Sequence, residues 1–146
     1  MVLIKIISFI IFLSTALIAD IKVVNNTGSN KSSYIKTLKG EKKIFVSSRD
    51  FGSSLSSRLY ENAERKKLVL YILGKRIKVS AGTSFLIIDD NPYQMIDAVQ
   101  EYNGDLYVPA ESFFDILRKV VIPGLRYDKL KDCLLYTSDA ADEWRR

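Results

Sequence analysis

The chain has 146 residues, an ordinary apolar content of 47% and a formal net charge of +5 at pH 7. This size and composition predict one small globular domain with appended segments, and they argue against a fully disordered chain and a multi-span membrane protein. The sequence contains no histidine and one cysteine. It therefore excludes histidine-ligated zinc or copper, Ser-His and Cys-His nucleophile pairs, an internal disulfide and a cysteine-only metal cluster. We expect neither catalytic residues nor a cofactor in this chain.

Residues 1–19 have the pattern of a secretory signal peptide. One lysine lies in the short segment Met1–Lys5, and a thirteen-residue apolar run, Ile6–Ile18, follows it. Ala19 closes the run and is the expected cleavage position, with Ala16 as the alternative. A retained anchor is the second interpretation, but the run is shorter than the roughly 20 residues of a membrane-spanning helix. We therefore expect an exported protein of the bacterial periplasm or cell envelope, with no stable membrane anchor after cleavage.

Residues 133–146 resemble a translated sequencing adapter. The segment Cys133–Glu143 matches the in-frame translation of an adapter used in transposon-based sequencing libraries, and its polar end continues no upstream pattern. The alternative is a natural tail. On the adapter interpretation we expect the reading frame to be cut near Asp132 and the natural protein to be longer.

Between these ends the sequence predicts short strands, beginning with an N-terminal part at residues 20–43. This part contains a strand at Ile21–Val24, a polar loop and the first arm of a hairpin. The arms of that hairpin are Tyr34–Leu38 and Ile44–Val46. Further along, Leu68–Leu73 carries apolar residues on both faces of a strand, which predicts a central position in a sheet.

Three tight turns follow this apolar segment. Gly74-Lys75 predicts a two-residue turn into the half-exposed return strand Arg76–Val79. The turn Asp89-Asp90-Asn91 predicts a second hairpin, with one arm on each side. Asn103-Gly104 predicts a turn into a strand at Leu106–Val108.

Two segments predict short helices, and each follows a strand. After Pro109, apolar residues recur at helical spacing from Phe113 to Val121. After Ser47, Phe51 and Leu55 stand four positions apart, among serines and a glycine that form a poor helix without tertiary support. The predicted fold class is therefore α+β, made of short β-hairpins and two short helices.

The two strand-to-helix segments also align with each other, about 62 positions apart. The segments 44–47 and 106–109 share an aliphatic-aromatic-Val-(Ser/Pro) pattern, and Phe51 then aligns with Phe113. A period of this size indicates a supersecondary unit used twice, here strand, helix and hairpin, with the second copy truncated.

The region from Ile44 to Tyr127 resembles the copper amine oxidase-like N-terminal domain, a module of exported bacterial proteins. The family pattern begins with a Val-Pro step, here Val46-Ser47, in which serine replaces the proline. A basic hairpin follows at Lys67–Val79, and a second step of the form Tyr-Val-Pro stands at residues 107–109. We assign the domain to residues 44–132, with an incomplete second repeat.

This resemblance implies a noncatalytic module at the N-terminus of a cell-wall hydrolase. Exported N-acetylmuramoyl-L-alanine amidases are typical parents of such modules. A zinc-dependent amidase needs histidine and glutamate ligands, so the resemblance implies that its catalytic domain lies outside this chain. Despite its name the module need not bind copper, and Met1 and Met95 are the only methionines to offer it.

Basic residues form the candidate binding surface. Six of them cluster at the two ends of one predicted hairpin: Arg65, Lys66, Lys67, Lys75, Arg76 and Lys78. Their charge predicts a surface for an anionic cell-wall or envelope polymer. The alternative is that lysines on exposed strands prevent edge pairing and keep the module soluble. Export and the lack of a recognised binding fold argue against nucleic acid.

Two classes of function stay open on this evidence. The first is a noncatalytic envelope module that positions or regulates a peptidoglycan hydrolase at the wall. The second is a stand-alone secreted binding or structural protein whose partner is another envelope protein.

Overall fold

The computed structural model describes residues 20–26, 32–40 and 42–137. The predicted signal peptide and residues 138–146 lie outside the described residues. The elements are, in chain order, β1 (Ile21–Asn25), β2 (Ser32–Ile35), β3 (Thr37–Lys39), β4 (Ile44–Ser47), α2 (Ser48–Ser54), β5 (Arg58–Asn62), β6 (Lys67–Ile72), β7 (Lys75–Ser80), β8 (Phe85–Ile88), β9 (Asn91–Gln94), β10 (Gln100–Tyr102), β11 (Asp105–Pro109), α3 (Ala110–Val120), β12 (Leu125–Asp128) and β13 (Cys133–Tyr136). Within these ranges no helix is both long and apolar enough to cross a bilayer.

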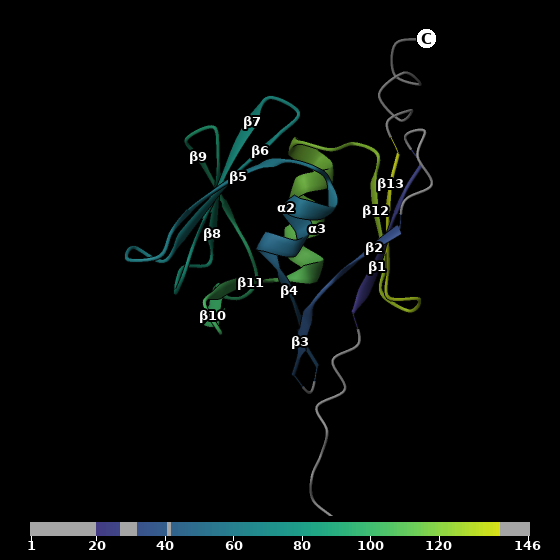
Figure 1. Ribbon diagram of the computed structural model, residues 1–146, viewed down its shortest axis with the longest axis horizontal. Coiled ribbons are helices and arrows are strands. Elements are labelled where there is room, and N and C mark those ends of the chain that lie inside the picture. Colours follow the sequence, from purple (N-terminus) through teal and green to yellow (C-terminus); the bar gives the residue numbers. More distant parts are fainter. Residues whose placement is uncertain (1–19, 27–31, 41, 138–146) are drawn as a thin grey trace, which may run out of the picture.

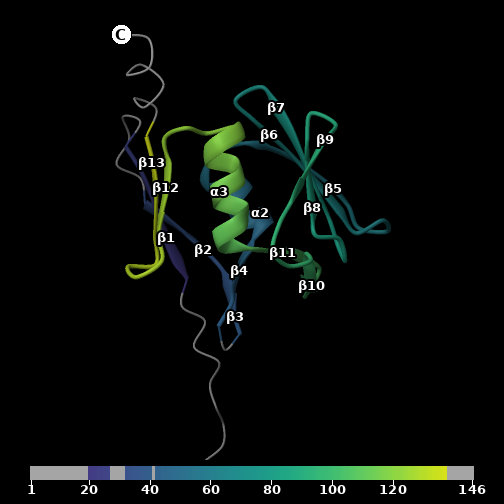
Figure 2. The same cartoon turned by 180° about the vertical axis from the view of Figure 1, so that it is seen from behind.

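The described strands form three sheets around the two helices. Their orders are β12-β13-β1-β2, β10-β11-β4-β3 and β5-β6-β7-β8-β9. The helices lie between the β5–β9 sheet and the sheet of β1, β2, β12 and β13, with β3 and β10 toward the lower end of the view (Figure 1). The view from behind shows the same layers (Figure 2). The predicted α+β class is confirmed.

The two helices are stabilised in different ways. In α3 the apolar residues Phe113, Phe114 and Leu117 are buried on one face, as the helical spacing predicts. The seven-residue helix α2 contains Gly52 and three serines, so its own helix propensity is low. Its Phe51 is fully buried and contacts the Phe113 ring edge-to-face, with the ring centroids 5.3 Å apart. Tertiary packing therefore supplies the stability that the α2 sequence lacks.

The two strand-to-helix junctions have nearly the same backbone conformation. The dihedral angles are φ −64° and ψ 117° at Ser47, and φ −63° and ψ 116° at Pro109. The strands β4 and β11 that precede them pair in antiparallel fashion, with Val46 opposite Val108. The 62-residue repeat itself stays a prediction.

Strand β6 lies inside its sheet but has only one buried face. It pairs with β5 on one side and β7 on the other. Leu68, Leu70 and Ile72 point into the core, whereas Tyr71 on the other face is 48% exposed. The predicted place inside a sheet is confirmed, but the second apolar face is not covered, because the helices lie against only one face of this sheet (Figure 1).

Two of the predicted hairpins differ in detail from the structure. The turn between β6 and β7 is Leu73-Gly74 instead of Gly74-Lys75, because Lys75 pairs with Ile72. The arm expected at Tyr34–Leu38 is interrupted at Lys36, so that β2 pairs with β1 and only β3 pairs with β4. At this residue the backbone N–H donates to the carboxylate of Asp50 in α2 at 3.0 Å.

The segment Cys133–Tyr136 is part of a sheet in the structure. It forms β13, which is parallel to β1 and antiparallel to β12. Leu134 is fully buried there. The adapter interpretation concerns the origin of these residues and stays a prediction, and its remaining residues, 138–146, lie outside the described ones.

The phenol of Tyr127 is the one buried side-chain group of the described residues without a hydrogen-bond partner. Its ring lies in β12 against Phe114, with the centroids 5.0 Å apart. Burial raises the pKa of Tyr127 to about 12, with smaller contributions from Asp132 and other nearby carboxylates.

We predict that Leu73→Asn stabilises the protein. Leu73 and Gly74 both have positive φ, 48° and 76°, which is the two-residue turn that favours Asn-Gly. Leu73 is 62% exposed, so its replacement removes no core contact. Urea unfolding should show a gain of about 0.5–1 kcal/mol. The control Leu73→Ala keeps a residue that disfavours positive φ and should gain nothing; equal effects of the two variants would contradict the prediction.

We predict that the Tyr127→Phe variant loses less stability than the wild type when the pH is raised into the alkaline range. In the wild type the unfolded chain releases the phenol proton near pH 10, whereas the folded chain holds it until about pH 12. The folded state therefore loses stability as the pH rises through this window. Urea unfolding at neutral and alkaline pH should show a smaller loss for Tyr127→Phe. At neutral pH the variant should be unchanged or more stable by up to about 1 kcal/mol. The control Tyr34→Phe, which removes an exposed hydroxyl, should behave like the wild type.

Candidate functional site

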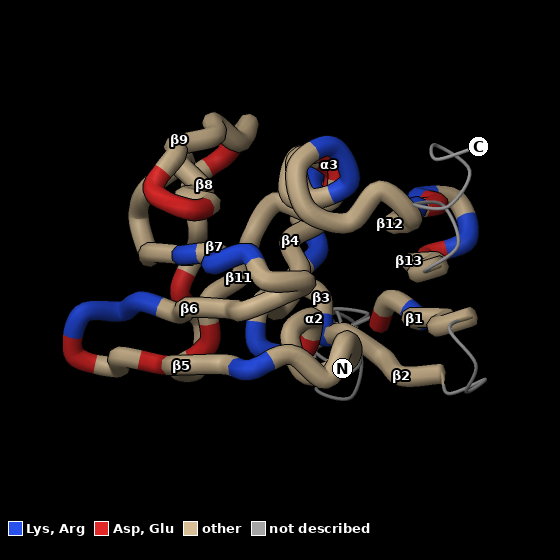
Figure 3. Tube along the Cα trace, turned by 90° about the horizontal axis from the view of Figure 1, so that it is seen from above, with Lys and Arg blue, Asp and Glu red and all other residues tan. Residues whose placement is uncertain are grey.

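The structure divides the six predicted basic residues between two places in the β5–β9 sheet. Arg65 and Lys66 lie in the turn between β5 and β6, and Lys67 is the first residue of β6. The other three belong to β7. Figure 3 shows these blue segments beside the acidic residues of the turn.

Three of the six are neutralised by neighbouring carboxylates. Lys66 Nζ lies 2.9 Å from Glu101 Oε2, and this hydrogen bond raises the pKa of Lys66. At the other end of the hairpin, Lys75 pairs with Asp89 at 3.3 Å. Arg76 pairs with Asp90 at 2.5 Å. The backbone N–H of Arg76 also donates to the Asp89 carboxylate, and this hydrogen bond lowers the pKa of Asp89.

The remaining three, Arg65, Lys67 and Lys78, form no ion pair within the described residues. Lys67 and Lys78 belong to the strand positions that alternate with the buried Leu68 and Val79. They therefore project from the face of the sheet that is turned away from the helices. The predicted cluster of six reduces to a smaller set of unpaired charges.

The basic residues of the first hairpin are also largely paired. Lys43 Nζ lies 2.7 Å from Asp97 Oδ1, and Lys39 Nζ lies 3.6 Å from Asp132 Oδ2. Lys36 lies 4.0 Å from Asp50. This hairpin therefore offers little free charge.

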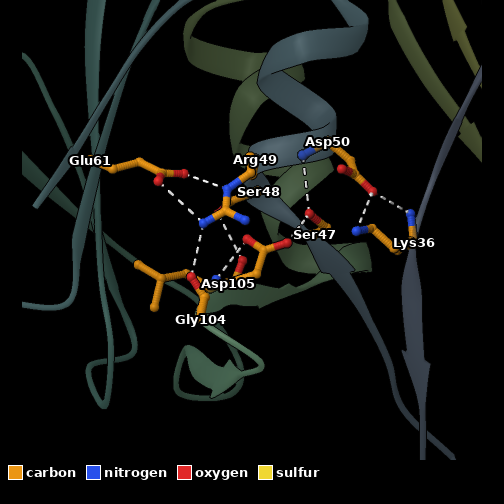
Figure 4. Close-up of polar contacts among 9 residues, drawn as sticks. Lys36, Ser47, Ser48, Arg49, Asp50, Glu61, Gly104 and Asp105 are labelled. Carbon is orange, nitrogen blue, oxygen red and sulfur yellow. Dashed lines mark hydrogen bonds and ion pairs between the residues drawn. The ribbon is translucent and has the colours of Figure 1, made fainter. Parts of the chain in front are cut away.

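A polar network that the sequence analysis missed lies where β4 leads into α2 (Figure 4). Ser47 is the N-cap of α2, and its Oγ accepts the Asp50 N–H at 3.0 Å. The same hydroxyl donates to Asp105 Oδ2 at 2.5 Å. Asp105 is 5% exposed and also accepts the N–H of Leu106 at 2.8 Å. The signal for this cap is the spacing Ser-x-x-Asp before a helix.

Arg49 joins this junction to two other elements. Its guanidinium donates to both carboxylate oxygens of Glu61 in β5 and to the Gly104 carbonyl at 2.9 Å (Figure 4). The hydrogen bond to Glu61 raises the pKa of Arg49. Ser48 adds a bond from its hydroxyl to the Leu106 carbonyl at 2.7 Å. Local sequence gives no signal for these contacts, because the partners come from distant strands.

A cavity of about 160 Å³ lies beside Arg49 and is lined mainly by side chains that already have partners. Arg49 pairs with Glu61, and Lys66 pairs with Glu101. Asp105 is held by Ser47. This arrangement binds the turn of β10 and β11 to α2 and β5, and it has the chemistry of a structural network.

The described residues contain no clustered set of metal ligands. No group of three histidine, cysteine, aspartate or glutamate side chains lies close enough within them to hold a metal ion. Met95 is 2% exposed and belongs to the core.

Comparison with known proteins identifies a family. A family model described as the copper amine oxidase N-terminal domain matches residues 16–123, so the resemblance seen in the sequence is confirmed. The matched span includes both helices and the whole β5–β9 sheet. No curated protein and no solved structure matches the chain.

We predict that Ser47→Ala destabilises the protein by about 1–2 kcal/mol, because it removes the cap of α2. It also removes the hydroxyl that donates to the buried Asp105. Combined with Asp105→Asn in a double-mutant cycle, it should show a coupling of about 1 kcal/mol. Chemical unfolding measures each value. The control Ser53→Ala changes an exposed serine of the same helix and should cost nothing; equal losses for both serines would contradict the capping role.

Proposed function

The chain belongs to the copper amine oxidase N-terminal domain family, and from this membership we propose that it is a module of an exported bacterial envelope protein. Domains of this family are not catalytic in themselves. The proposed role is to position or regulate a peptidoglycan hydrolase at the wall by binding an anionic polymer. The proposed parent is an N-acetylmuramoyl-L-alanine amidase with its zinc ligands in another domain.

The proposed binding role is supported by two lysines that lie on one sheet face and have no ion-pair partner among the described residues. Lys67 and Lys78 project from the face of β6 and β7 that the helices leave open. A lysine without a neighbouring acid keeps its full charge for a ligand, whereas a paired one, such as Lys66, is already neutralised. The proposed site is therefore this face of the sheet, and the turn at residues 63–66 contributes through Arg65.

Export of the module is supported by the sequence of its N-terminus. The predicted signal peptide has a short basic start and an apolar run of thirteen residues. The amidase parent is supported by the family alone. An uninterrupted copy of the gene tests it: a downstream domain with histidine and glutamate zinc ligands would support the proposal, and a stop codon soon after Asp132 would contradict it.

We predict that the purified chain sediments with peptidoglycan sacculi at low salt and is released at high salt. Between about 0.01 M and about 1 M salt the Debye length falls from about 30 Å to about 3 Å, so electrostatic binding to an exposed face should be lost. The double variant Lys67→Glu/Lys78→Glu should lose most of the retention at low salt.

The matched control is Lys22→Glu/Lys131→Glu, which changes the net charge equally. Both control lysines are exposed; Lys22 belongs to β1, and Lys131 lies in the turn between β12 and β13. These strands form the sheet on the far side of the helices (Figure 1). This variant should keep the retention. Absence of retention by the wild type at low salt, or equal losses for the two variants, would show that the lysines act only in solubility or edge protection.

A further inference from the structure

The open face of the β5–β9 sheet carries exposed aromatic side chains as well as lysines. Tyr60 is 73% exposed, Tyr71 is 48% exposed and Phe85 is 45% exposed. Each belongs to a different strand. Tyr71 and Phe85 alternate with buried residues that face the helices, and Tyr60 lies opposite Val69, which is on the same face of β6 as Tyr71. In the two ribbon views no element covers this face (Figures 1 and 2). Exposed aromatic groups gathered on one face are a mark of a binding surface.

The strand register brings aromatic and cationic side chains together. Tyr71 stands directly between Arg58 on β5 and Arg76 on β7. Directly opposed residues in antiparallel strands have their Cβ atoms about 5 Å apart, and they point to the same side. Tyr71 therefore lies between two arginine side chains on the open face, and the guanidinium of one of them, Arg76, pairs with Asp90.

A second row crosses the whole sheet one step further along. Val69 on β6 lies between Tyr60 on β5 and Lys78 on β7. Lys78 in turn pairs with Ile87 on β8, and Ile87 pairs with Pro92 on β9. The row is apolar except for Lys78. Tyr60 and Tyr71 are diagonal neighbours across β5 and β6, about 7–8 Å apart.

All the charged side chains of this face are basic. The residues whose side chains project from it within the five strands are Arg58, Tyr60, Asn62, Lys67, Val69, Tyr71, Arg76, Lys78, Ser80, Phe85, Ile87, Pro92 and Gln94. None of these is acidic. Asp90, in the adjoining turn between β8 and β9, pairs with Arg76. Arg58, Lys67 and Lys78 form no ion pair within the described part of the chain.

We infer that this face binds an acidic glycan, a chain of sugar rings that carry carboxylate groups. The C–H face of a sugar ring packs on an aromatic ring, as Tyr60 and Tyr71 offer, while the unpaired cations Arg58, Lys67 and Lys78 bind the carboxylates. The inference rests on the proposed function and deepens it. Binding of an anionic polymer by charge alone would need only the lysines, whereas binding of a glycan also uses the aromatic rings. It also brings in residues outside the six predicted ones: Arg58, Tyr60, Tyr71 and Phe85.

The glycan is favoured over a protein or nucleic acid ligand by the surface itself. An open sheet face suits a chain that lies across the strands, and the row beside Lys78 offers uncharged side chains that would pack against sugar rings without charge. A single-stranded nucleic acid, which carries one phosphate at every step, would be matched by a denser set of cations.

The test uses three soluble polymers with the purified chain. Polygalacturonate has sugar rings and carboxylates, polyacrylate has carboxylates without rings, and dextran has rings without charge. We expect the wild type to bind polygalacturonate more tightly than either of the others. The variant Tyr60→Thr/Tyr71→Thr keeps strand-forming residues and should weaken polygalacturonate binding by about tenfold or more, with polyacrylate binding unchanged.

The matched control is Tyr34→Thr/Tyr102→Thr. These tyrosines are 60% and 52% exposed and belong to strands of the other two sheets. The control should bind all three polymers like the wild type. Thermal melting of each variant verifies that the fold is kept, and Tyr60→Phe/Tyr71→Phe, which keeps the rings, should restore polygalacturonate binding.

Several results would overturn the inference. One is equal binding of polygalacturonate and polyacrylate, and another is wild-type affinity for polygalacturonate in the Tyr60→Thr/Tyr71→Thr variant. Tighter binding to oligo(dT) would assign the face to nucleic acid. Self-association that is lost in the tyrosine variant would assign it to a second copy of the chain.

Failure of the inference is distinguishable from failure of the proposed function. If retention on sacculi is salt-sensitive but unchanged in the Tyr60→Thr/Tyr71→Thr variant, the glycan inference alone would be overturned. Ring-dependent binding of polygalacturonate without retention on sacculi would support the glycan surface and overturn the role at the wall.

Discussion

The contact between Phe51 and Phe113 joins the two helices on which the rest of the structure depends. Both rings are fully buried, and they meet edge-to-face. Phe114 extends the same cluster toward Tyr127 in β12. Through Gly52, α2 also approaches β6 so closely that a Cβ atom there would lie 2.5 Å from the Leu70 side chain. The helices thus form a single apolar layer to which the flanking sheets attach.

This layer decides which surfaces of the molecule are free. A sheet that packs on it buries one face and leaves the other to solvent, as the alternating burial of β6 and β7 shows. The described chain has no second helical layer to cover the outer face of β5–β9 (Figure 1). The exposure of the rings and cations on that face is therefore a consequence of the layer order.

The polar groups of the interior serve the fold. Ser47 caps α2 and holds the buried Asp105, and Arg49 bridges Glu61 and the Gly104 carbonyl. These groups form hydrogen bonds and ion pairs with one another, so few of them are free to react with a molecule in the adjacent cavity. This agrees with a family whose domains are not catalytic in themselves. It also explains why the short α2, with low intrinsic propensity, is held at both its N-cap and its apolar face.

The sequence by itself determined the α+β class, the helix after Pro109, the Asn103-Gly104 turn and the family, because each depends on local spacing or turn chemistry. Only the tertiary structure decided that Lys66 is paired and Lys78 is not, that Leu68–Ile72 has an open face, and that Arg58 flanks Tyr71. The physical reason is that pairing and exposure depend on partners from distant strands, and the strand register that brings those partners together is set by the packing of each sheet on the helices.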